Sequence, residues 1–313
     1  MVDAHYRDYE IEQTILAPLG ARIEVVTTGG DAARLQRAVR HAEAVMVREA
    51  PVDARTIASM ERCRVIVRYG VGVDNIDLAA ARDRRIFVAN VPDYGTDDVA
   101  EHTLALILAV YRRVAQFDRA IRRGRWLPDD NRIYRLRGKA LGIVGFGRIG
   151  RSLWTKCQGL GLERCLVYDP LVADDVEGVE RVDLDALCRE VDIVTLHAPL
   201  TPQTTHLIDA RRLALLKPTA VLVNTARGRL VDEDALVKAL RERRLLGAGL
   251  DVYGQEPVPA DHPVMSLDNV VLTPHIAWYS EESMVDLKTK AAQEVARVLT
   301  GQAPLHWVNR WEE

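Results

Sequence analysis

The sequence predicts an α/β protein built from two doubly wound parallel-sheet domains. Two observations support this fold class. Short apolar segments of strand length alternate with amphipathic segments along nearly the whole chain, and 313 residues with 48% hydrophobic content suffice for two cores. Such alternation is typical of parallel sheets with helices on both faces. We expect one domain at residues 1–97 plus 282–313 and the other at residues 98–281.

Composition narrows the functional classes. The formal net charge of −3 disfavours a general affinity for nucleic acid or anionic membrane, and no segment reaches the roughly 20 apolar residues of a membrane span. The basic stretch Arg112–Lys139 lacks a recognition-helix pattern and is interpreted as a solvated face. The four cysteines show no metal-ligand spacing, so we expect free thiols, no metal site and a cytoplasmic enzyme or binding protein.

The first domain is expected to be flavodoxin-like. Strands are predicted at residues 23–26, 44–47, 65–67 and 86–89, and helices at 11–19, 32–40 and 52–58. Its start is unusual, because only Met1-Val2-Asp3 precedes a polar segment where the central first strand should lie. Either this strand is very short or the chain as given begins inside it. We therefore predict a weakened or unusually open first domain, or a true start further upstream.

A long helix is predicted from Asp97 to Arg123. Apolar residues lie on several of its faces, which is typical of a helix buried between domains or subunits. Residues 124–138 contain Pro128 and few apolar positions, so they are interpreted as a connection. The last helix, at residues 281–300, is expected to return and pack on the first domain.

Strands of the second domain end in residues with useful chemistry. These strands are predicted at 140–144, 166–168, 192–196, 220–223, 247–250 and 270–272. The carboxyl ends of parallel strands share one edge of a sheet, where ligands bind. We therefore expect one site to collect the polar residues that follow them, namely Asp169, Arg227, Glu256 and His275.

The clearest motif is Gly145-Phe-Gly147-Arg-Ile-Gly150, between an apolar strand and a helix predicted at 151–159. The first glycine permits a tight turn, the second lets the backbone approach a pyrophosphate, and the third allows close helix–strand packing. The helix amino terminus offers N–H groups to the phosphates. Asp169, 19 residues after the last glycine, is expected to bind the ribose hydroxyls. A Rossmann domain that prefers NAD is predicted, although Arg148 or Arg151 offers a partner for the 2′-phosphate of NADP.

Three residues suit hydride-transfer chemistry. Reduction of a 2-oxo acid needs a hydride at C2 and a proton for the oxygen, and His275 can supply this proton as an imidazolium. Glu256 would favour the charged imidazole, and Arg227 can bind a carboxylate or polarise the keto oxygen. Each residue also has an ordinary alternative, since Arg227 competes with Arg229 as a surface charge and Glu256 precedes a proline.

With these motifs the chain resembles the D-isomer-specific 2-hydroxyacid dehydrogenase family over nearly its whole length. The matching stretches are Tyr69–Asp77, Val99–Glu101, Gly145–Gly150, His197–Thr204, Val223–Gly228, Glu256-Pro257 and Thr273–Ile276. Within the family the C-terminal-binding-protein branch is most similar, because His275-Ile-Ala-Trp-Tyr-Ser280 replaces the usual small residues after the histidine.

The resemblance implies roles for individual residues. Arg227, Glu256 and His275 match the catalytic triad of the family. The backbone N–H groups of Val71, Gly72 and Val73 match its carboxylate-binding turn. Contacts to NAD are implied for Thr96, Gly145, Gly147, Arg148, Ile149, Gly150, Asp169, His197, Ala198, Pro199, Thr204, Thr225, Ala226 and Asp251. His102 and His206 are interpreted as structural, and a homodimer is expected.

The predicted activity is hydride transfer between NAD(H) and C2 of a D-2-hydroxy acid or 2-oxo acid. Trp278, three residues after the acid/base, either forms an apolar wall that favours an apolar or thioether side chain, or packs a domain junction. A second hypothesis is an NAD-responsive, peptide-binding corepressor with little turnover. The short N-terminus and the lack of a long tail disfavour it.

Overall fold

The computed structural model describes residues 1–126, 132–172 and 176–311. The chain forms two compact units, which we call unit 1 (Met1–Gly95 with Ser280–Glu313) and unit 2 (Thr96–Tyr279). Each unit is a parallel α/β sheet, which confirms the predicted fold class. The connection predicted at 124–138 lies partly outside the described residues. Among the residues described, no helix is both long and apolar enough to cross a membrane.

Unit 1 has a short central sheet. Strands β1 (Ala44–Val47), β2 (Val65–Arg68) and β3 (Phe87–Ala89) are parallel and adjacent in that order. Val2 adds isolated parallel bridges to Val26 and Val47. The resulting order is the flavodoxin-like 2-1-3-4-5, with the first two strands reduced to single bridges. The strand predicted at 23–26 is thus reduced to the bridge at Val26.

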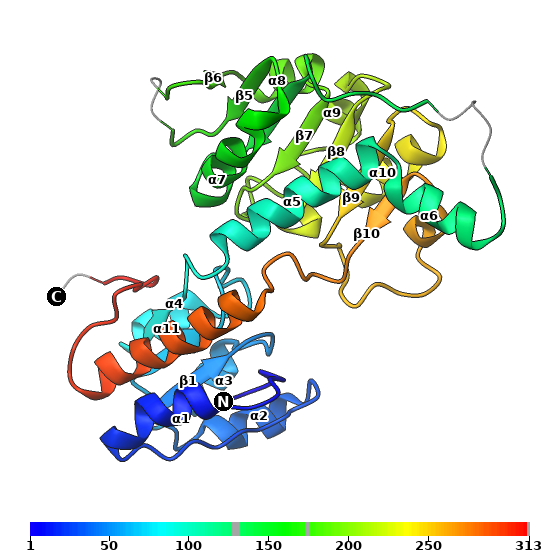
Figure 1. Ribbon diagram of the computed structural model, residues 1–313. Coiled ribbons are helices and arrows are strands. Elements are labelled where there is room, and N and C mark those ends of the chain that lie inside the picture. The colour runs from blue at the N-terminus through cyan, green and yellow to red at the C-terminus, as the bar shows by residue number, and fades with distance from the viewer. Residues whose placement is uncertain (127–131, 173–175, 312–313) are drawn as a thin grey trace. The chain divides into compact units, whose positions relative to one another are not determined.

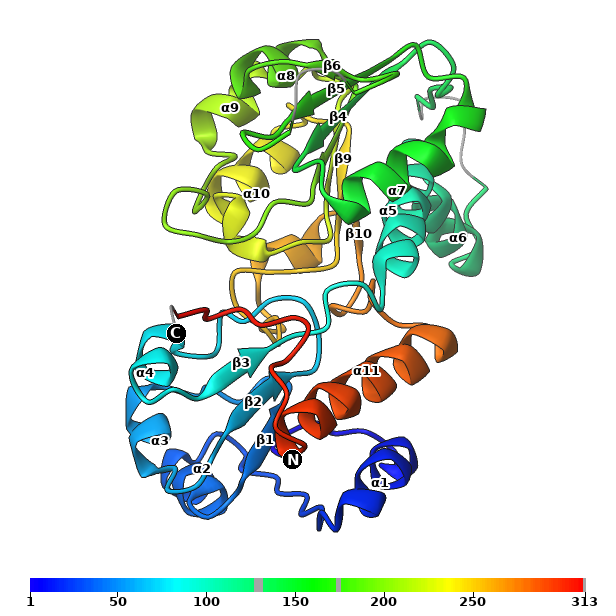
Figure 2. The same ribbon diagram turned by 90° about the vertical axis from the view of Figure 1, so that its left-hand side faces the viewer.

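Helices cover both faces of this sheet. They are α1 (Glu10–Leu16), α2 (Ala32–Val39), α3 (Ala54–Ser59), α4 (Leu78–Asp83) and α11 (Glu281–Leu299). Helices α2 to α4 lie on one face and α11 on the other, next to α1 (Figure 2). The helix predicted at 11–19 ends as an α-helix at Leu16, because Pro18 lacks the N–H that the next turn needs. Asp53 accepts a hydrogen bond from the Thr56 N–H, so α3 begins two residues later than predicted.

The sheet of unit 2 has the order β10-β9-β8-β7-β4-β5-β6 and is parallel throughout. Its strands are β4 (Ala140–Val144), β5 (Arg164–Tyr168), β6 (Glu180–Arg181), β7 (Ile193–Leu196), β8 (Val221–Asn224), β9 (Gly247–Leu250) and β10 (Val270–Leu272). The chain runs outward from β4 to β6 and then from β7 to β10 on the other side. The strand order therefore reverses between β4 and β7, where such sheets bind ligands at the carboxyl ends.

Two apolar layers sandwich this sheet. Helices α5 (Thr96–Tyr111) and α7 (Arg148–Cys157) pack on one face, as Figures 1 and 2 show. Helices α8 (Leu184–Glu190), α9 (Ala210–Leu215) and α10 (Glu233–Arg241) pack on the other. Strands buried on both faces read as continuous apolar runs, which is why the sequence located them closely.

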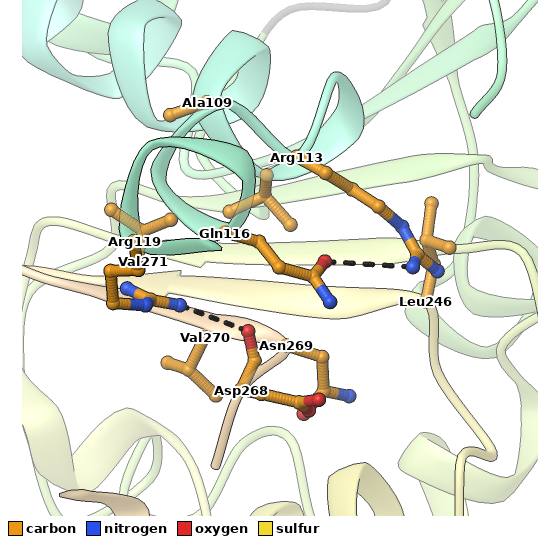
Figure 3. A pocket seen from close by; sticks show the side chains of 10 residues that line it. Ala109, Arg113, Gln116, Arg119, Leu246, Asp268, Asn269, Val270 and Val271 are labelled. Carbon is orange, nitrogen blue, oxygen red and sulfur yellow. Dashed lines mark hydrogen bonds between the residues drawn. The ribbon is translucent and has the colours of Figure 1, made fainter. Parts of the chain in front are cut away.

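The long helix predicted from Asp97 to Arg123 is instead two helices. Helix α5 ends at Tyr111 and α6 spans Val114–Arg122, because Arg113 adopts a left-handed backbone with φ 56°. The break directs α6 toward the amino end of β10, where Arg119 donates a hydrogen bond to the Asp268 carbonyl at 3.1 Å (Figure 3). A shallow pocket between α6 and this end of β10 is lined by Arg119, Asp268 and Asn269, among others. It lies at the opposite end of β10 from His275.

A buried ion pair joins the first and last helices of unit 1. The Lys288 side chain is 5% exposed and its Nζ lies 3.6 Å from the Glu12 carboxylate, which is 0% exposed. Lys288 also donates to the Asp8 carboxylate at 2.8 Å, and Tyr69 donates to Glu12 at 2.9 Å. Because α11 comes from the far end of the chain, this pair helps to fix the return of the C-terminal segment to unit 1.

We predict that Lys288→Met lowers the free energy of unfolding by about 3 kcal/mol, because it leaves the Glu12 charge buried without its cation. Adding Glu12→Gln should recover most of this loss. The control is Lys290→Met on the same helix, which removes a more exposed pair and should cost less than about 1 kcal/mol. Urea unfolding measures the stability of all three variants. Equal losses in Lys288→Met and Lys290→Met would show that the burial of the Lys288–Glu12 pair does not determine its contribution.

Candidate active site

The glycine loop after β4 has the space that a dinucleotide needs. Gly145 has a φ of 92°, and a Cβ there would lie 2.7 Å from the Ala198 nitrogen. A Cβ on Gly150 would lie 2.5 Å from the Gly145 oxygen, whereas one on Gly147 would meet nothing within 4 Å. The loop is therefore closed toward the protein and open at Gly147. Helix α7 begins at Arg148, three residues earlier than predicted, and no side chain caps its amino terminus.

Asp169 lies beside this loop at the end of β5. Its Oδ2 accepts a hydrogen bond from the Phe146 N–H at 2.8 Å, and its Oδ1 accepts one from the Leu171 N–H at 2.9 Å. The carboxylate is thus held next to the open side of the glycine loop. The Arg151 guanidinium lies 4.8 Å from the centre of the Phe146 ring. These contacts fit the ribose-binding role predicted for Asp169.

The loop after β7 lies on the other side of the strand-order reversal. The His197 N–H donates to the Val144 carbonyl at 2.7 Å, and the Thr204 hydroxyl closes the loop by donating to the Pro199 carbonyl at 2.7 Å. Both ring nitrogens of His197 are buried and have no hydrogen-bond partner among the described residues. Burial lowers the pKa of His197 to about 4, so the ring is neutral near pH 7.

The loop after β8 carries Arg227. Asn224 shapes this loop, because its amide donates to the Arg227 carbonyl at 2.8 Å and accepts from the Ala226 N–H at 3.1 Å. The Arg227 guanidinium donates to the Ala226 carbonyl at 2.7 Å. A Cβ on Gly228 would overlap the Tyr253 backbone, so the loop fits against the segment after β9 only with glycine there.

Glu256 and His275 form a direct pair. The Glu256 Oε2 lies 2.6 Å from the His275 Nδ1, and its Oε1 accepts a hydrogen bond from the Tyr253 N–H at 2.9 Å. Burial by itself would raise the pKa of Glu256, but the hydrogen bond and charge of His275 and the charge of Arg227 lower it overall. Glu256 is therefore an anion at neutral pH, placed to hold the ring of His275.

The backbone around His275 is tied to β9. His275 has a left-handed φ of 52°, and its N–H donates to the Asp251 carbonyl at 2.7 Å. The Asp251 side chain is 0% exposed and accepts hydrogen bonds from the Ile276 and Ala277 N–H groups, both at 2.9 Å. The Trp278 indole N–H donates to the His275 carbonyl at 2.9 Å. Asp251 and Trp278, predicted to contact cofactor and substrate, thus both support the His275 loop.

Unit 2 therefore brings the glycine loop, Asp169 and the Glu256–His275 pair to one edge of its sheet. Thr96 is the first residue of α5. The turn Val71-Gly72-Val73 belongs to unit 1, where Asn90 donates to the Val71 carbonyl at 2.6 Å. In the ranges that the structure describes, no group of His, Cys, Asp and Glu side chains is arranged to hold a metal ion.

Several residues with supporting contacts were missed by the sequence reasoning. They are Asn224, Thr273 and Thr103, which bind other loop residues through side-chain hydrogen bonds. Asn224 and Thr273 lie inside motifs whose other residues carry the predicted roles, and Thr103 lies inside an apolar helix. The sequence feature that could have indicated these residues is a polar side chain at the end of a predicted strand or on the buried face of a predicted helix.

The matching family is the D-isomer specific 2-hydroxyacid dehydrogenases, whose NAD-binding-domain model matches residues 104–277. The chain belongs to this family. Its second unit is the NAD-binding domain, and its cofactor is NAD.

Known relatives have related activities. The chain is 42% identical to a glyoxylate reductase of Korarchaeum cryptofilum over 83% of this chain and 80% of that protein. It is 40% identical to the D-3-phosphoglycerate dehydrogenase of Methanocaldococcus jannaschii over 91% of this chain, but spans only 55% of that protein. The D-lactate dehydrogenase of Aquifex aeolicus, solved with NAD and lactic acid, has 28% identity and a TM-score of 0.86, covering 96% of this chain and 95% of that one.

We predict that His197 makes stability depend on pH between its unfolded pKa of 6.5 and its folded pKa of about 4. The unfolded ring gains a proton in this window and the folded ring does not, so stability falls as the pH falls from 6.5 toward 4. His197→Leu should flatten this part of the profile. Urea midpoints at pH 7 and pH 5 measure it, with the exposed His206→Leu as control. Parallel profiles for wild type and His197→Leu would refute the assignment.

Proposed function

We propose that the protein reduces a 2-oxo acid to a D-2-hydroxy acid with NADH and catalyses the reverse oxidation with NAD. NAD, when bound, supplies or accepts the hydride at C2 of the substrate. The observation that carries the proposal is the 2.6 Å contact between His275 Nδ1 and Glu256 Oε2. In this family such a pair supports the assignment of His275 as the acid/base.

The contact favours one ring nitrogen of His275 for the proposed proton exchange. Because Nδ1 faces Glu256, the Nε2 of His275 is the nitrogen left for the substrate oxygen, and none of the described residues bonds it. The anionic Glu256 orients the ring for this exchange through its contact with Nδ1. The His275 side chain is 39% exposed, so a small substrate can reach it.

Arg227 is proposed to bind the substrate carboxylate and to polarise the carbonyl that gains charge. Its guanidinium is permanently cationic and presents N–H donors in a fork that matches a carboxylate. Its backbone is fixed by Asn224 and by the fit of Gly228 against Tyr253, which limits the positions that it can reach. The backbone N–H groups of Val71-Gly72-Val73 are proposed as further donors to a substrate carboxylate.

Further contacts to NAD are proposed at four loops, those after β4, β5, β7 and β8. Gly147 and the amino terminus of α7 would receive the pyrophosphate, and Asp169 the ribose hydroxyls, with repulsion of a 2′-phosphate. The loops that begin at His197 and Thr225 would line the nicotinamide side. Trp278 is proposed to face the substrate side chain with its ring, since its N–H already binds the His275 carbonyl.

We predict that His275→Gln lowers kcat by at least about 100-fold, because a glutamine amide cannot exchange a proton with the substrate oxygen. The dissociation constant of NADH, followed by fluorescence, should not change. His206→Gln is a matched control, since His206 is exposed and has a similar left-handed φ of 51°. Retained turnover in His275→Gln would show that another group exchanges the proton.

Arg227→Ala should raise KM for the 2-oxo acid and lower kcat together, because both the ground state and the developing oxyanion lose a cation. Arg229→Ala, two residues further along and exposed, is the control and should behave as wild type. Steady-state kinetics with a panel of 2-oxo acids measures both variants. An unchanged KM in Arg227→Ala would show that another residue binds the substrate carboxylate.

The corepressor-like alternative, and with it the C-terminal-binding-protein branch, stays a prediction based on the segment His275–Ser280. The relatives named above are described as enzymes, which favours turnover. Absence of NADH oxidation with every 2-oxo acid, together with specific peptide binding, would favour the alternative.

A homodimer is also proposed. The buried residues of α5 pack on its own sheet, so we propose that α6, the other part of the helix predicted at 97–123, supplies the contact. Around α6, Val114, Ile121 and Trp126 are 58%, 53% and 90% exposed, which is unusual for apolar side chains so close together. Sedimentation should show a dimer that Ile121→Asp weakens. A monomeric wild type at micromolar concentration would refute the proposal.

A further inference from the structure

Two consecutive residues of α5 contact two different loops of the active site. His102 reaches the loop after β10, which carries His275, and Thr103 reaches the loop after β8, which carries Arg227. We infer that His102 and Thr103 are positioning residues, which hold the acid/base and the arginine in a fixed relation to the sheet. This inference rests on the proposed function, because it concerns the same catalytic groups.

The contact of Thr103 has a defined direction. Its hydroxyl donates to the Val99 carbonyl at 2.7 Å within α5, so its only proton is used there. The Thr225 hydroxyl lies 2.8 Å away and must therefore donate to Thr103. Thr103 is 0% exposed and Thr225 is 8% exposed, so water does not compete for this bond. Thr225 precedes Arg227 by two residues in the same loop.

The contact of His102 belongs to a longer chain of hydrogen bonds. The Thr273 hydroxyl donates to the Asp251 Oδ1 at 2.5 Å, so the His102 Nε2, 3.0 Å from that hydroxyl, must be the donor to it. Asp251 in turn accepts from the Ile276 and Ala277 N–H groups. The chain therefore runs from α5 through two side chains to the backbone that follows His275.

Helix α5 is a suitable anchor for both loops. Its apolar face is buried on the sheet through Leu106, Ile107 and Val110, so it moves little relative to the strands. Asp97 near its amino terminus accepts a hydrogen bond from Ser152 of α7 at 2.7 Å. His275 has a left-handed backbone that persists only where neighbouring contacts hold it. One helix thus fixes both catalytic loops and contacts the helix of the glycine loop.

Threonine-to-valine variants test the two contacts separately, because they keep the branched shape and remove the hydroxyl. Thr273→Val should lower kcat about tenfold and leave NADH binding unchanged, because the acid/base loop loses one hydrogen bond of its support. Thr103→Val should instead raise KM for the 2-oxo acid about tenfold, because the Arg227 loop is released. Thr273→Ser and Thr103→Ser keep the hydroxyl and should stay close to wild type.

His102 offers a further comparison. His102→Gln keeps an N–H donor at about the position of the His102 Nε2. His102→Leu removes this donor and leaves a side chain of similar volume. We expect His102→Leu to match Thr273→Val and His102→Gln to recover most of kcat. Thr155→Val on α7 is the control, since its exposed hydroxyl bonds only its own helix, at 3.1 Å to the Arg151 carbonyl. It should change neither constant.

Hydrogen–deuterium exchange of the full chain without ligand measures how firmly the two loops are held, and it does not depend on turnover. Thr273→Val and His102→Leu should accelerate exchange severalfold in peptides covering residues 273–279 only, and Thr103→Val in peptides covering 224–230 only. Unchanged exchange and kinetics in all three would overturn the inference, and so would equal acceleration throughout unit 2. An inactive wild type would refute the proposed function, while the exchange pattern would still decide the inference.

Discussion

The active site depends on one buried carboxylate, that of Asp251 at the end of β9. A charge without access to water must be satisfied by nearby donors, and here these are the Thr273 hydroxyl and the N–H groups of Ile276 and Ala277. The loop that carries His275 therefore has to pass close to β9 with its N–H groups turned inward. The left-handed backbone of His275 is a consequence of this path.

The parallel sheet of unit 2 explains why the site residues lie close together. All strands of unit 2 end at the same edge, so the loops that follow β4, β5, β7, β8, β9 and β10 meet there although they lie far apart in sequence. Helices cover both faces of the strands, which makes the edge rigid. The reversal of strand order between β4 and β7 separates the glycine loop from the loop of His197. The glycine loop and the Glu256–His275 pair thus both lie at the carboxyl edge of one parallel sheet.

Apolar runs and glycine spacing in the sequence predicted the strands of unit 2 and its glycine loop. The strand ends, the glycine loop beside Asp169 and the Glu256–His275 pair all follow from positions at the edge of a parallel sheet. The break of the long helix was missed because a left-handed arginine, Arg113, carries no local signal. The contact of His102 with Thr273 was also beyond reach, since the two residues are 171 positions apart and only packing brings them together.

The pair at the centre of the site is mutually dependent. Burial alone would favour a neutral Glu256, and it is the ring of His275 that makes the anion favourable. The anion in turn orients that ring by its contact with Nδ1. Asp251 and α5 support the His275 loop through contacts inside unit 2. The same helix holds the loop of Arg227 through the contact of Thr103 with Thr225, so the side chains proposed for catalysis are all anchored to one sheet.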